Sequence, residues 1–281
     1  MMKQKNILIT GCSSGIGHCL ARGLRDRGYR VFAGARKMAD VETLAQAGYE
    51  SLPLDLNSSG SIHAAVATVL NRTGGELYAL INNGAYGQPG AVEDLSREAL
   101  RAQFETNVFG TQELTNRVIP CMRTQGAGRI VQISSLLGIV CLAYRGAYNA
   151  SKFALEALSD TMRLELRGTN IYVSLIEPGP IESRFRANAH EAFKLHIDRE
   201  HSVNRDYYAR VEQRLGGTKP LPFTLPPEAV LKKVIRALEA NKPRARYPVT
   251  VPSHLFTVLR RVLTVRALDA ILAAVSNSGQ R

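Results

Sequence analysis

Short apolar, β-prone segments alternate with segments of helical periodicity along most of this 281-residue chain. Buried parallel strands have such an apolar composition, and strands that alternate with helices pair in parallel through right-handed crossovers. The sequence therefore predicts an α/β fold, a doubly wound parallel sheet in a three-layer α/β/α arrangement, as a single domain over residues 1–281. The expected strands are residues 6–10, 29–34, 50–56, 77–85, 128–135, 171–176 and 247–249.

The first expected strand leads into a glycine-rich turn, and a helical pattern follows up to Gly28. Glycines let the backbone approach a pyrophosphate, and a helix N-terminus offers free N–H groups and the positive end of its dipole. The spacing is G-x-x-x-G-x-G, which differs from the common G-x-G-x-x-G, and the G-K-[ST] of a P-loop is absent. Tight packing alone would also use glycines, but the strand–turn–helix context favours a dinucleotide site. Its expected residues are Gly11, Ser13, Ser14, Gly15, Ile16 and Gly17.

The end of the second expected strand distinguishes between the two nicotinamide dinucleotides. A site that prefers NAD has an acidic residue about 20 residues beyond the glycine turn, where it accepts a hydrogen bond from the ribose 2′-hydroxyl. Arg36 and Lys37 occupy that place here. A carboxylate would repel a 2′-phosphate, whereas the planar fork of Arg36 binds one. We therefore expect NADP(H), while noting that a merely solvated strand end would contain the same residue types.

Small or polar residues stand where other strands end, and ligands of parallel sheets bind beyond those ends. Asp55, followed by Leu56, ends the third strand, where its carboxylate would accept from the adenine amino group or cap the next helix. Asn107 lies inside a helix expected over residues 97–122, where an Asn competes for backbone hydrogen bonds and marks a kink or a site. The residues at predicted strand ends are Gly11, Asp55, Asn83, Ser135 and Pro178.

Tyr148 and Lys152 are four residues apart on an expected helix, which places both side chains on one face. A neighbouring ammonium favours the phenolate, so we expect the pKa of Tyr148 to fall below its usual value of about 10. A tyrosine poised in this way exchanges a proton near neutral pH, as general acid–base catalysis requires. Taken alone, such a pair is more often a chance neighbour on a solvated helix face, so the catalytic interpretation depends on the dinucleotide site.

The composition narrows the classes of partner. A net charge of +12 and a pI near 9.8 favour anionic ligands, nucleic acid or an anionic membrane surface. The basic residues are dispersed and no zinc-finger spacing occurs, so we expect no nucleic-acid partner. Neither the four cysteines nor the histidines show metal-ligand spacing, so we expect no metal and reduced thiols. No apolar run reaches the length of a membrane span or of a signal-peptide core, so we expect a cytoplasmic protein.

Taken together, these motifs resemble the short-chain dehydrogenase/reductase family, whose members have a Rossmann fold. The motifs cover residues 6 to about 185 in the family's order, and the 13-residue step from Ser135 to Tyr148 is the usual one. The whole chain, including residues 244–249, resembles the branch that contains retinol and 17β-hydroxysteroid dehydrogenases and bacterial NADP-dependent aldehyde reductases. The matching motifs are Thr10-Gly11-x-x-x-Gly15-Ile16-Gly17, Asn82-Asn83-Gly84-Ala85, Asn107, Ser135, Tyr148-x-x-x-Lys152 and Pro178-Gly179.

The resemblance implies a role for each matching residue. Tyr148 would donate a proton in reduction and accept one in oxidation, and Lys152 would lower its pKa and bind the nicotinamide ribose. Ser135 would hydrogen-bond the substrate oxygen, with Ser134 as the less favoured candidate, and Asn107 would hold a water of the proton relay. Beyond the glycine turn and Arg36, the implied cofactor-binding residues are Asp55, Leu56, Asn83, Pro178, Ile181 and Ser183, in addition to Tyr148 and Lys152.

The sequence departs from the family pattern at two places outside the catalytic set. Gly84-Ala85 reverses the usual Ala-Gly, and Ser183 stands where Thr is usual. Residues 184–225 have an irregular pattern, and their length suits a mobile segment that covers the substrate. Its large apolar residues suggest an apolar pocket, so we expect a lipophilic aldehyde, ketone or alcohol, with reduction as the direction set by cellular NADPH. These residues are Phe185, Phe193, Leu195, Tyr207, Tyr208 and Phe223.

Two alternatives accompany the prediction of an NADP(H)-dependent oxidoreductase. A non-catalytic NADP-sensing regulator would share the fold, but such proteins commonly lose the Tyr or the Lys that this chain retains. A helix expected over residues 253–275 has an apolar stripe beside arginines, which either contacts a membrane surface weakly or, as we favour, packs on its own core or a partner subunit. Since the family usually forms dimers or tetramers, we expect a homodimer or homotetramer.

Overall fold

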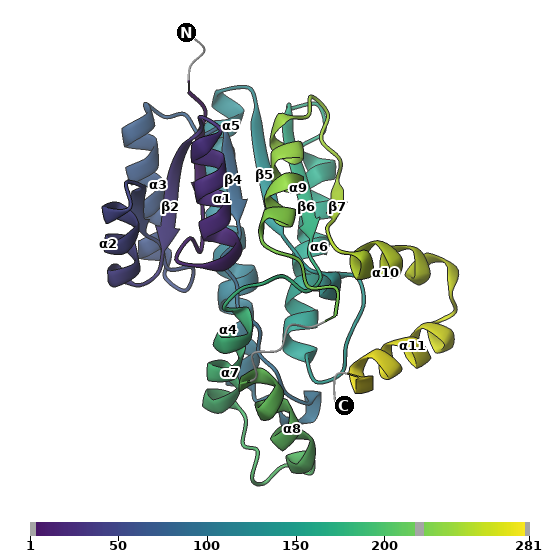
Figure 1. The fold of residues 1–281 in the computed structure, drawn as a ribbon. Coiled ribbons are helices and arrows are strands. Elements are labelled where there is room, and N and C mark those ends of the chain that lie inside the picture. Colours follow the sequence, from purple (N-terminus) through teal and green to yellow (C-terminus); the bar gives the residue numbers. More distant parts are fainter. Residues whose placement is uncertain (1–3, 217–221, 279–281) are drawn as a thin grey trace.

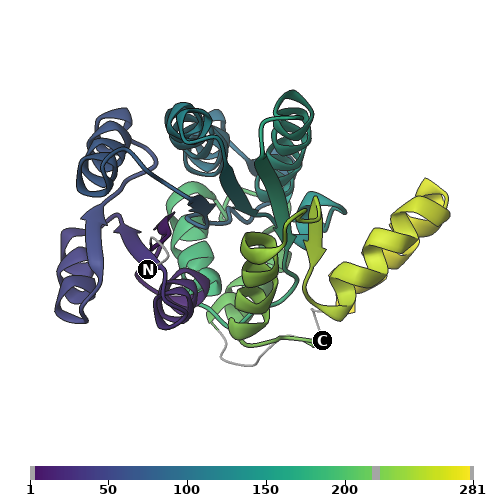
Figure 2. The same ribbon diagram turned by 90° about the horizontal axis from the view of Figure 1, so that it is seen from above.

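A parallel sheet forms the centre of the protein (Figures 1 and 2). The computed structural model describes residues 4–216 and 222–278, and over these residues the sheet has seven strands in the order β3-β2-β1-β4-β5-β6-β7. The chain begins in the middle and winds outward in both directions, which confirms the predicted doubly wound sheet. The strands are β1 (Asn6–Ile9), β2 (Arg30–Ala35), β3 (Glu50–Pro53), β4 (Ala79–Asn82), β5 (Gly128–Ile133), β6 (Ile171–Glu177) and β7 (Arg246–Pro248).

Helices cover both faces of the sheet because its strands are apolar on both sides. Ile7 and Ile9 of β1 pack into the cluster under one helical layer, and Leu8 between them packs into the cluster under the other. The view from above in Figure 2 shows the two layers with the sheet between them. One layer contains α1 (Gly15–Asp26), α2 (Met38–Gln46) and α9 (Glu228–Glu239), and the other contains α3 (Ser59–Thr73), α5 (Thr111–Thr124) and α6 (Gly146–Glu165).

The helix expected over residues 97–122 follows a helical path with one irregular turn. It consists of α4 (Arg97–Phe104), a π-helical turn η2 (Glu105–Gly110) and α5. A Cβ on Gly110 would lie 1.8 Å from the carbonyl oxygen of Leu56, so only glycine allows this turn to approach the loop after β3. Asn107 lies in the π-helical turn, a feature that often occurs at functional sites. The expected kink or site at Asn107 is therefore confirmed as a local change of helical geometry.

The segment 184–225, expected to be irregular, contains two helices instead. They are α7 (Phe185–His196) and α8 (Arg205–Gly216), and in Figure 1 they lie with α4 below the sheet. Phe193, Tyr207 and Tyr208 form a small buried aromatic core between them. The expectation of irregular structure was wrong because contacts with distant residues stabilise these helices, and the sequence pattern does not show such contacts. Residues 217–221 of the expected segment lie outside the described part of the chain.

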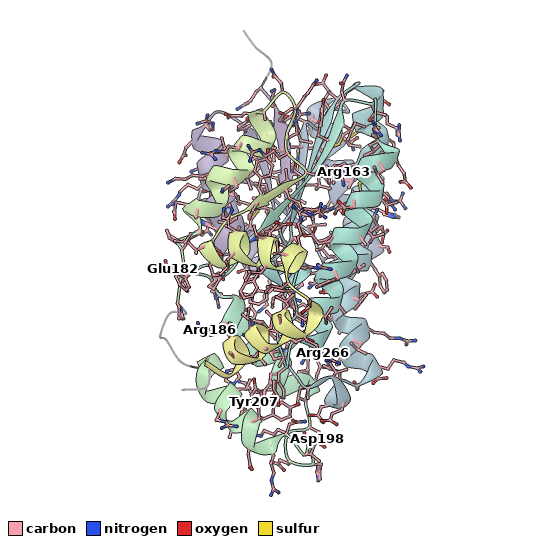
Figure 3. All side chains as sticks on the ribbon, turned by 90° about the vertical axis from the view of Figure 1, so that its right-hand side faces the viewer. Arg163, Glu182, Arg186, Asp198, Tyr207 and Arg266 are labelled. Atoms are coloured by element: carbon pink, nitrogen blue, oxygen red, sulfur yellow. The ribbon has the colours of Figure 1, made fainter. Side chains whose placement is uncertain are left out.

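The C-terminal stretch also differs from the sequence prediction. In place of one helix over residues 253–275, it forms α10 (Val251–Val262) and α11 (Val265–Ser278), because the backbone becomes extended at Leu263. Phe256 and Leu272 pack with the loop after β5, which confirms that one face lies on the protein's own core. Figure 3 looks at this side of the molecule and shows Arg266 on α11 between Arg163 above and Tyr207 below.

Two short 3₁₀ helices complete the described elements, η1 (Val92–Asp94) and η3 (Leu136–Gly138). Among the described helices, none combines the length and the apolar character that crossing a membrane requires.

Candidate active site

The carboxyl ends of β1 and β4 are joined by side-chain hydrogen bonds. The amide nitrogen of Asn83 donates to the carbonyl oxygens of Thr10 at 2.9 Å and Gly11 at 3.1 Å. The hydroxyl of Thr10 accepts from the backbone N–H groups of Asn83 at 2.9 Å and Gly84 at 2.7 Å. These contacts fix the glycine turn against the loop that follows β4. Asn83, predicted to line the adenosine side of the cofactor, therefore also shapes the turn itself.

The glycine turn has the geometry of a phosphate cradle. Gly11 and Gly15 have φ angles of +70° and +54°, which favour glycine. A Cβ on Gly17 would lie 2.1 Å from the carbonyl oxygen of Gly11, so the helix packs directly on the turn. Ser14 is the N-cap residue of α1, and its side chain makes no capping hydrogen bond there; the first turn contains no acidic residue. The N-terminus of α1 is thus suited to an anionic group.

The ribose-phosphate end of the expected site contains Arg36 and Asp55. Arg36 is exposed just beyond β2, and its positive charge opposes the burial that raises the pKa of Tyr86 to about 12. The charge of Arg36 therefore acts on the loop after β4. The carboxylate of Asp55 accepts from the backbone N–H of Asn57 at 3.0 Å, and Ser58 caps α3. The alternative that Asp55 caps this helix is therefore wrong, since Asp55 stabilises the loop before it.

Other predicted cofactor residues lie around the same turn. A Cβ on Gly15 would lie 2.9 Å from the Cβ of Ser183, so the glycine turn touches the loop after β6. In that loop, the carbonyl oxygen of Pro178 accepts from the N–H of Leu136, 2.8 Å away in the loop after β5. Ile16 and Ile181 both pack against the buried cluster under α1. Leu56 is buried and lies within 3.3 Å of the position of a Cβ on Gly84.

The four predicted catalytic residues come from three elements. Tyr148 and Lys152 lie in the first turns of α6, Ser135 follows β5, and Asn107 lies in the π-helical turn. The hydroxyl of Ser135 lies close enough to the phenol of Tyr148 to lower the pKa of that phenol. The ammonium of Lys152 is buried, lies 5.8 Å from the centre of the Tyr148 ring and donates to the carbonyl oxygen of Ile133 at 2.8 Å. The structure thus places Ser135 and Lys152 beside Tyr148 at the same strand end.

The pKa of Tyr148 differs from the sequence prediction. Burial raises the pKa of Tyr148 to about 12, and the nearby hydroxyl of Ser135 and the charge of Arg145 offset only part of this rise. The expectation that Lys152 lowers the pKa of Tyr148 was wrong for this structure, because burial dominates and the ammonium donates to a carbonyl instead. Burial lowers the pKa of Lys152 to about 8, against the opposing effect of Glu156. At neutral pH the phenol therefore retains its proton beside a charged ammonium.

Asn107 connects the π-helical turn with the loop after β4 and with α6. Its amide nitrogen donates to the carbonyl oxygen of Tyr86 at 2.9 Å and to the hydroxyl of Ser151 at 3.1 Å. Its amide oxygen accepts from the N–H of Tyr86 at 3.2 Å. Gln103, one helical turn earlier, donates to the same carbonyl at 2.9 Å and accepts from the N–H of Gln88 at 2.7 Å. The sequence analysis missed Gln103, although its four-residue spacing from Asn107 was a usable signal.

One aromatic side chain lies directly against the catalytic tyrosine. Phe185 packs edge-on to Tyr148, with the ring centroids 5.3 Å apart and the planes at 62°. A Cβ on Gly87 would lie 2.7 Å from the Phe185 ring, so the loop after β4 closes against the same ring. Since Phe185 is the first residue of α7, this helix contributes an apolar side chain to the candidate active site.

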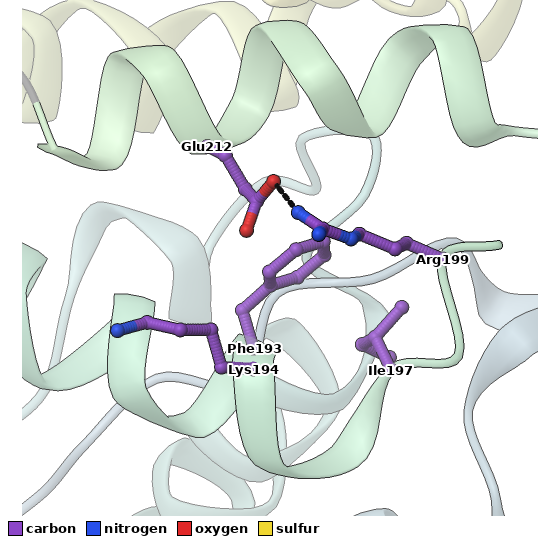
Figure 4. A pocket seen from close by; sticks show the side chains of 5 residues that line it. All are labelled: Phe193, Lys194, Ile197, Arg199 and Glu212. Atoms are coloured by element: carbon purple, nitrogen blue, oxygen red, sulfur yellow. Dashed lines mark hydrogen bonds and ion pairs between the residues drawn. The ribbon is translucent and has the colours of Figure 1, made fainter.

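The other apolar residues expected to line the substrate pocket lie elsewhere. Phe193, Tyr207 and Tyr208 are buried in the core between α7 and α8, and Leu195 and Phe223 are exposed. A cavity of about 180 Å³ in this region is lined by Phe193, Lys194, Ile197, Arg199 and Glu212 (Figure 4). Arg199 and Glu212 form an ion pair across it, and it contains none of the predicted catalytic residues. The expected pocket is therefore corrected to a single wall residue, Phe185.

Comparison with known proteins identifies a family model and several relatives that match the chain. The family model described as short chain dehydrogenase matches residues 5–193. An uncharacterized oxidoreductase of Escherichia coli K12, YbbO, is 43% identical over 269 residues, which cover 96% of this chain and 94% of that protein. Human retinol dehydrogenase 8 is 39% identical over 191 residues, 64% of this chain and 60% of that protein.

Two further proteins resemble the chain over nearly its whole length. An NADPH-dependent 3-dehydrocapnine reductase of Ornithobacterium rhinotracheale is 29% identical over 272 residues, 94% of both proteins. The crystal structure of a short-chain dehydrogenase from Streptomyces avermitilis superimposes with a TM-score of 0.77 at 28% identity, covering 98% of this chain and 99% of that one.

Proposed function

The chain belongs to the short-chain dehydrogenase family and is an oxidoreductase of that family, and from this premise we propose that it uses NADP(H) to interconvert a lipophilic aldehyde or ketone and the corresponding alcohol. The observation that carries the proposal is the phenol of Tyr148. It is buried, close to the hydroxyl of Ser135, and 5.8 Å from the ammonium of Lys152 measured to the ring centre. A phenol in this setting retains its proton at neutral pH, which suits a proton donor in carbonyl reduction.

Each residue of the site would have a separate role in the proposed reaction. A bound nicotinamide cofactor supplies the hydride. The hydroxyls of Ser135 and Tyr148 would hold the carbonyl oxygen of the substrate, and Tyr148 would protonate it as negative charge develops there. The charge of Lys152 would stabilise the phenolate left behind. Asn107 and Gln103 hold the loop after β4 in place, which keeps Gly87 against the wall of the site.

The proposal of NADP(H) over NAD(H) depends on Arg36. Its charge acts on the phenol of Tyr86, which lies in the loop after β4. A guanidinium at this place favours a 2′-phosphate, and no acidic residue precedes it in β2. The similar O. rhinotracheale reductase is NADPH-dependent, which supports the same preference.

A lipophilic substrate fits the apolar surroundings of the catalytic tyrosine. Phe185 forms one wall, and the loop after Ser135 consists of apolar residues that pack with α10 and α11. These surroundings offer few groups to hydrogen-bond a polar substrate, so recognition beyond the carbonyl would rely on apolar contact. The residues of this loop in contact with the C-terminal helices are Leu136, Ile139, Val140 and Leu142.

The experiment that tests the proposal follows NADPH absorbance with a panel of aldehydes and ketones of increasing chain length. We expect turnover that rises with the apolar character of the carbonyl compound and is weaker with NADH. Turnover with no carbonyl compound, despite tight NADPH binding, would contradict the proposal and favour the NADP-sensing regulator. No feature of the described catalytic residues favours that regulator at present, since the Tyr, Lys, Ser and Asn are all in place. A cytoplasmic location and a homodimer or homotetramer remain predictions.

A further inference from the structure

Three carboxylates share one guanidinium behind the catalytic helix. Arg246 of β7 lies 3.0 Å from Glu156 and 2.6 Å from Asp160, both on α6. Its Nε atom is 3.2 Å from the carboxylate of Glu177, the last residue of β6. The Glu177 side chain is 0% exposed and that of Glu156 only 9%, so both carboxyl groups are buried, and burial raises the pKa of both. Groups of this kind are costly unless they are paired, so their presence beside an active site needs a reason.

The cluster is built directly onto the catalytic elements. Glu156 is one helical turn beyond Lys152, and Asp160 is one turn further along α6. A Cβ on Gly138, in the loop after Ser135, would lie 3.0 Å from the Cγ of Glu156 and 3.2 Å from the carbonyl oxygen of Lys152. The loop that carries Ser135 therefore rests on the turn between Lys152 and Glu156.

Lys152 needs a nearby negative charge because its ammonium is buried. Its side chain donates to the carbonyl oxygen of Ile133, which is uncharged. Burial lowers the pKa of Lys152, and Glu156 is the group that opposes this effect. The other charged or titratable groups that face this cluster are Tyr148, Asp160 and Arg163 on α6, Glu177 on β6, Arg246 on β7 and Arg261 on α10.

We propose that Glu156, held in place by Arg246, is a positioning residue that keeps the Lys152 ammonium charged inside the active site. Arg246 fixes the Glu156 carboxylate, and Asp160 and Glu177 in turn hold Arg246 from two sides. Asp160 contacts the same guanidinium but lies two turns from Lys152 and is more exposed. The inference rests on the proposed function in one respect, because the charge of Lys152 has a role only in the proposed reaction.

The test measures the pKa of Lys152 directly in the full chain. Protein labelled with ¹³C-lysine is titrated by NMR, and the Cε signal that is missing from a Lys152→Arg variant identifies Lys152. Glu156→Gln removes the charge at nearly constant shape, and we expect it to lower the pKa of Lys152 by roughly one unit. Asp160→Asn is the matched control, because it removes one negative charge that contacts the same guanidinium. We expect the pKa of Lys152 in this variant to stay near the wild-type value.

Two further variants separate the loss of the Glu156 charge from a loss of folding. Glu156→Asp retains the charge and should restore most of the wild-type pKa, whereas Glu156→Leu is a second neutral variant if the amide does not fold. The alkaline limb of the pH profile of kcat should move with the measured pKa, towards lower pH in the neutral variants. Equal Lys152 pKa values in Glu156→Gln and Asp160→Asn would overturn the inference. The proposed function is judged separately, since its failure would appear as an inactive wild-type protein with an unchanged titration.

Discussion

At the scale of single residues, we expect the side chain at position 36 to decide which dinucleotide the protein prefers. Arg36 is exposed beyond β2, and its charge acts on the phenol of Tyr86 in the loop after β4. We expect Arg36→Asp to weaken NADPH binding roughly 10- to 100-fold, because charge-assisted hydrogen bonds to a 2′-phosphate are lost and repulsion is added. NADH binding should be equal or tighter, since a carboxylate accepts from the ribose hydroxyl.

The measurement is the dissociation constant of each dinucleotide, obtained from nicotinamide fluorescence. Lys37→Asp is the matched control, because it makes the same charge change one residue further on, at the N-cap of α2. An unchanged ratio of NADPH to NADH affinity in Arg36→Asp would show that Arg36 is only part of a solvated strand end.

The glycine turn keeps its shape because residue 17 is a glycine and has no Cβ. A Cβ at this position would lie 2.1 Å from the carbonyl oxygen of Gly11 and 2.6 Å from the amide nitrogen of Asn83. We expect Gly17→Ala to reduce the free energy of unfolding by about 1–3 kcal/mol and to weaken NADPH binding, because α1 must move away from the turn.

Thermal denaturation and NADPH titration of Gly17→Ala check this expectation. Gly60→Ala, in the first turn of α3, is the control, because the nearest atom to its new Cβ would be 3.8 Å away. Equal stability of the two variants would mean that the turn tolerates a wider spacing than the structure shows.

At the scale of elements, α7 contributes its first residue to the candidate active site. Phe185 packs edge-on against Tyr148, and the rest of α7 packs on α8. We expect Phe185→Ala to raise KM for long-chain apolar carbonyl compounds about 5- to 100-fold, because burial of an aromatic side chain against substrate contributes about 1–3 kcal/mol. The effect on short-chain substrates should be smaller.

Steady-state kinetics across a series of chain lengths separates these cases. Leu195→Ala, an exposed position on the same helix, should leave KM unchanged for the whole series. A KM for long-chain substrates that is the same in Phe185→Ala and wild type would remove Phe185 from the substrate site.

The sequence predicted the elements whose signals are local. The glycine turn, the strand ends and the Tyr148–Lys152 pair were placed correctly because each depends on spacing within a few residues. The helices α7 and α8 were missed because their stability comes from an aromatic core shared with residues near Ala91. The break between α10 and α11 occurs at Leu263-Thr264, where neither glycine nor proline marks it.

Two features of the site were also beyond the reach of sequence patterns. The contacts among Glu156, Glu177 and Arg246 join residues up to 90 positions apart on three elements, so no local spacing reveals them. The pKa of Tyr148 depends on how deeply the phenol is buried, and burial outweighs the expected effect of Lys152.

At the scale of the whole molecule, exposed apolar side chains gather on the C-terminal helices. Of the large apolar residues that are exposed in the described part of the chain, seven of sixteen lie between Val251 and Val275. Leu255 and Val258 belong to a stripe on the outer face of α10, opposite the face that packs on the core. With a net charge of +12 on the chain, we expect weak binding to anionic vesicles that declines as salt is added.

Flotation with vesicles that contain phosphatidylglycerol checks this expectation. A double variant, Leu255→Glu with Val258→Glu, should abolish the binding. Val203→Glu, at an even more exposed apolar position between α7 and α8, should leave the binding intact. If the wild-type protein stays with the unbound fraction at low salt, the outer face of α10 has a different role, such as contact with a partner subunit.

The whole account depends on the phenol of Tyr148 as the proton donor beside the cofactor. The most direct measurement compares Tyr148→Phe with wild type for NADPH oxidation by an accepted aldehyde and for NADPH binding, with Tyr172→Phe in β6 as a control for loss of a phenol hydroxyl elsewhere. We expect Tyr148→Phe to lower kcat by about 10²- to 10⁴-fold while the dissociation constant of NADPH changes little, because only proton transfer is lost. A Tyr148→Phe variant that retains near-wild-type kcat would contradict the account.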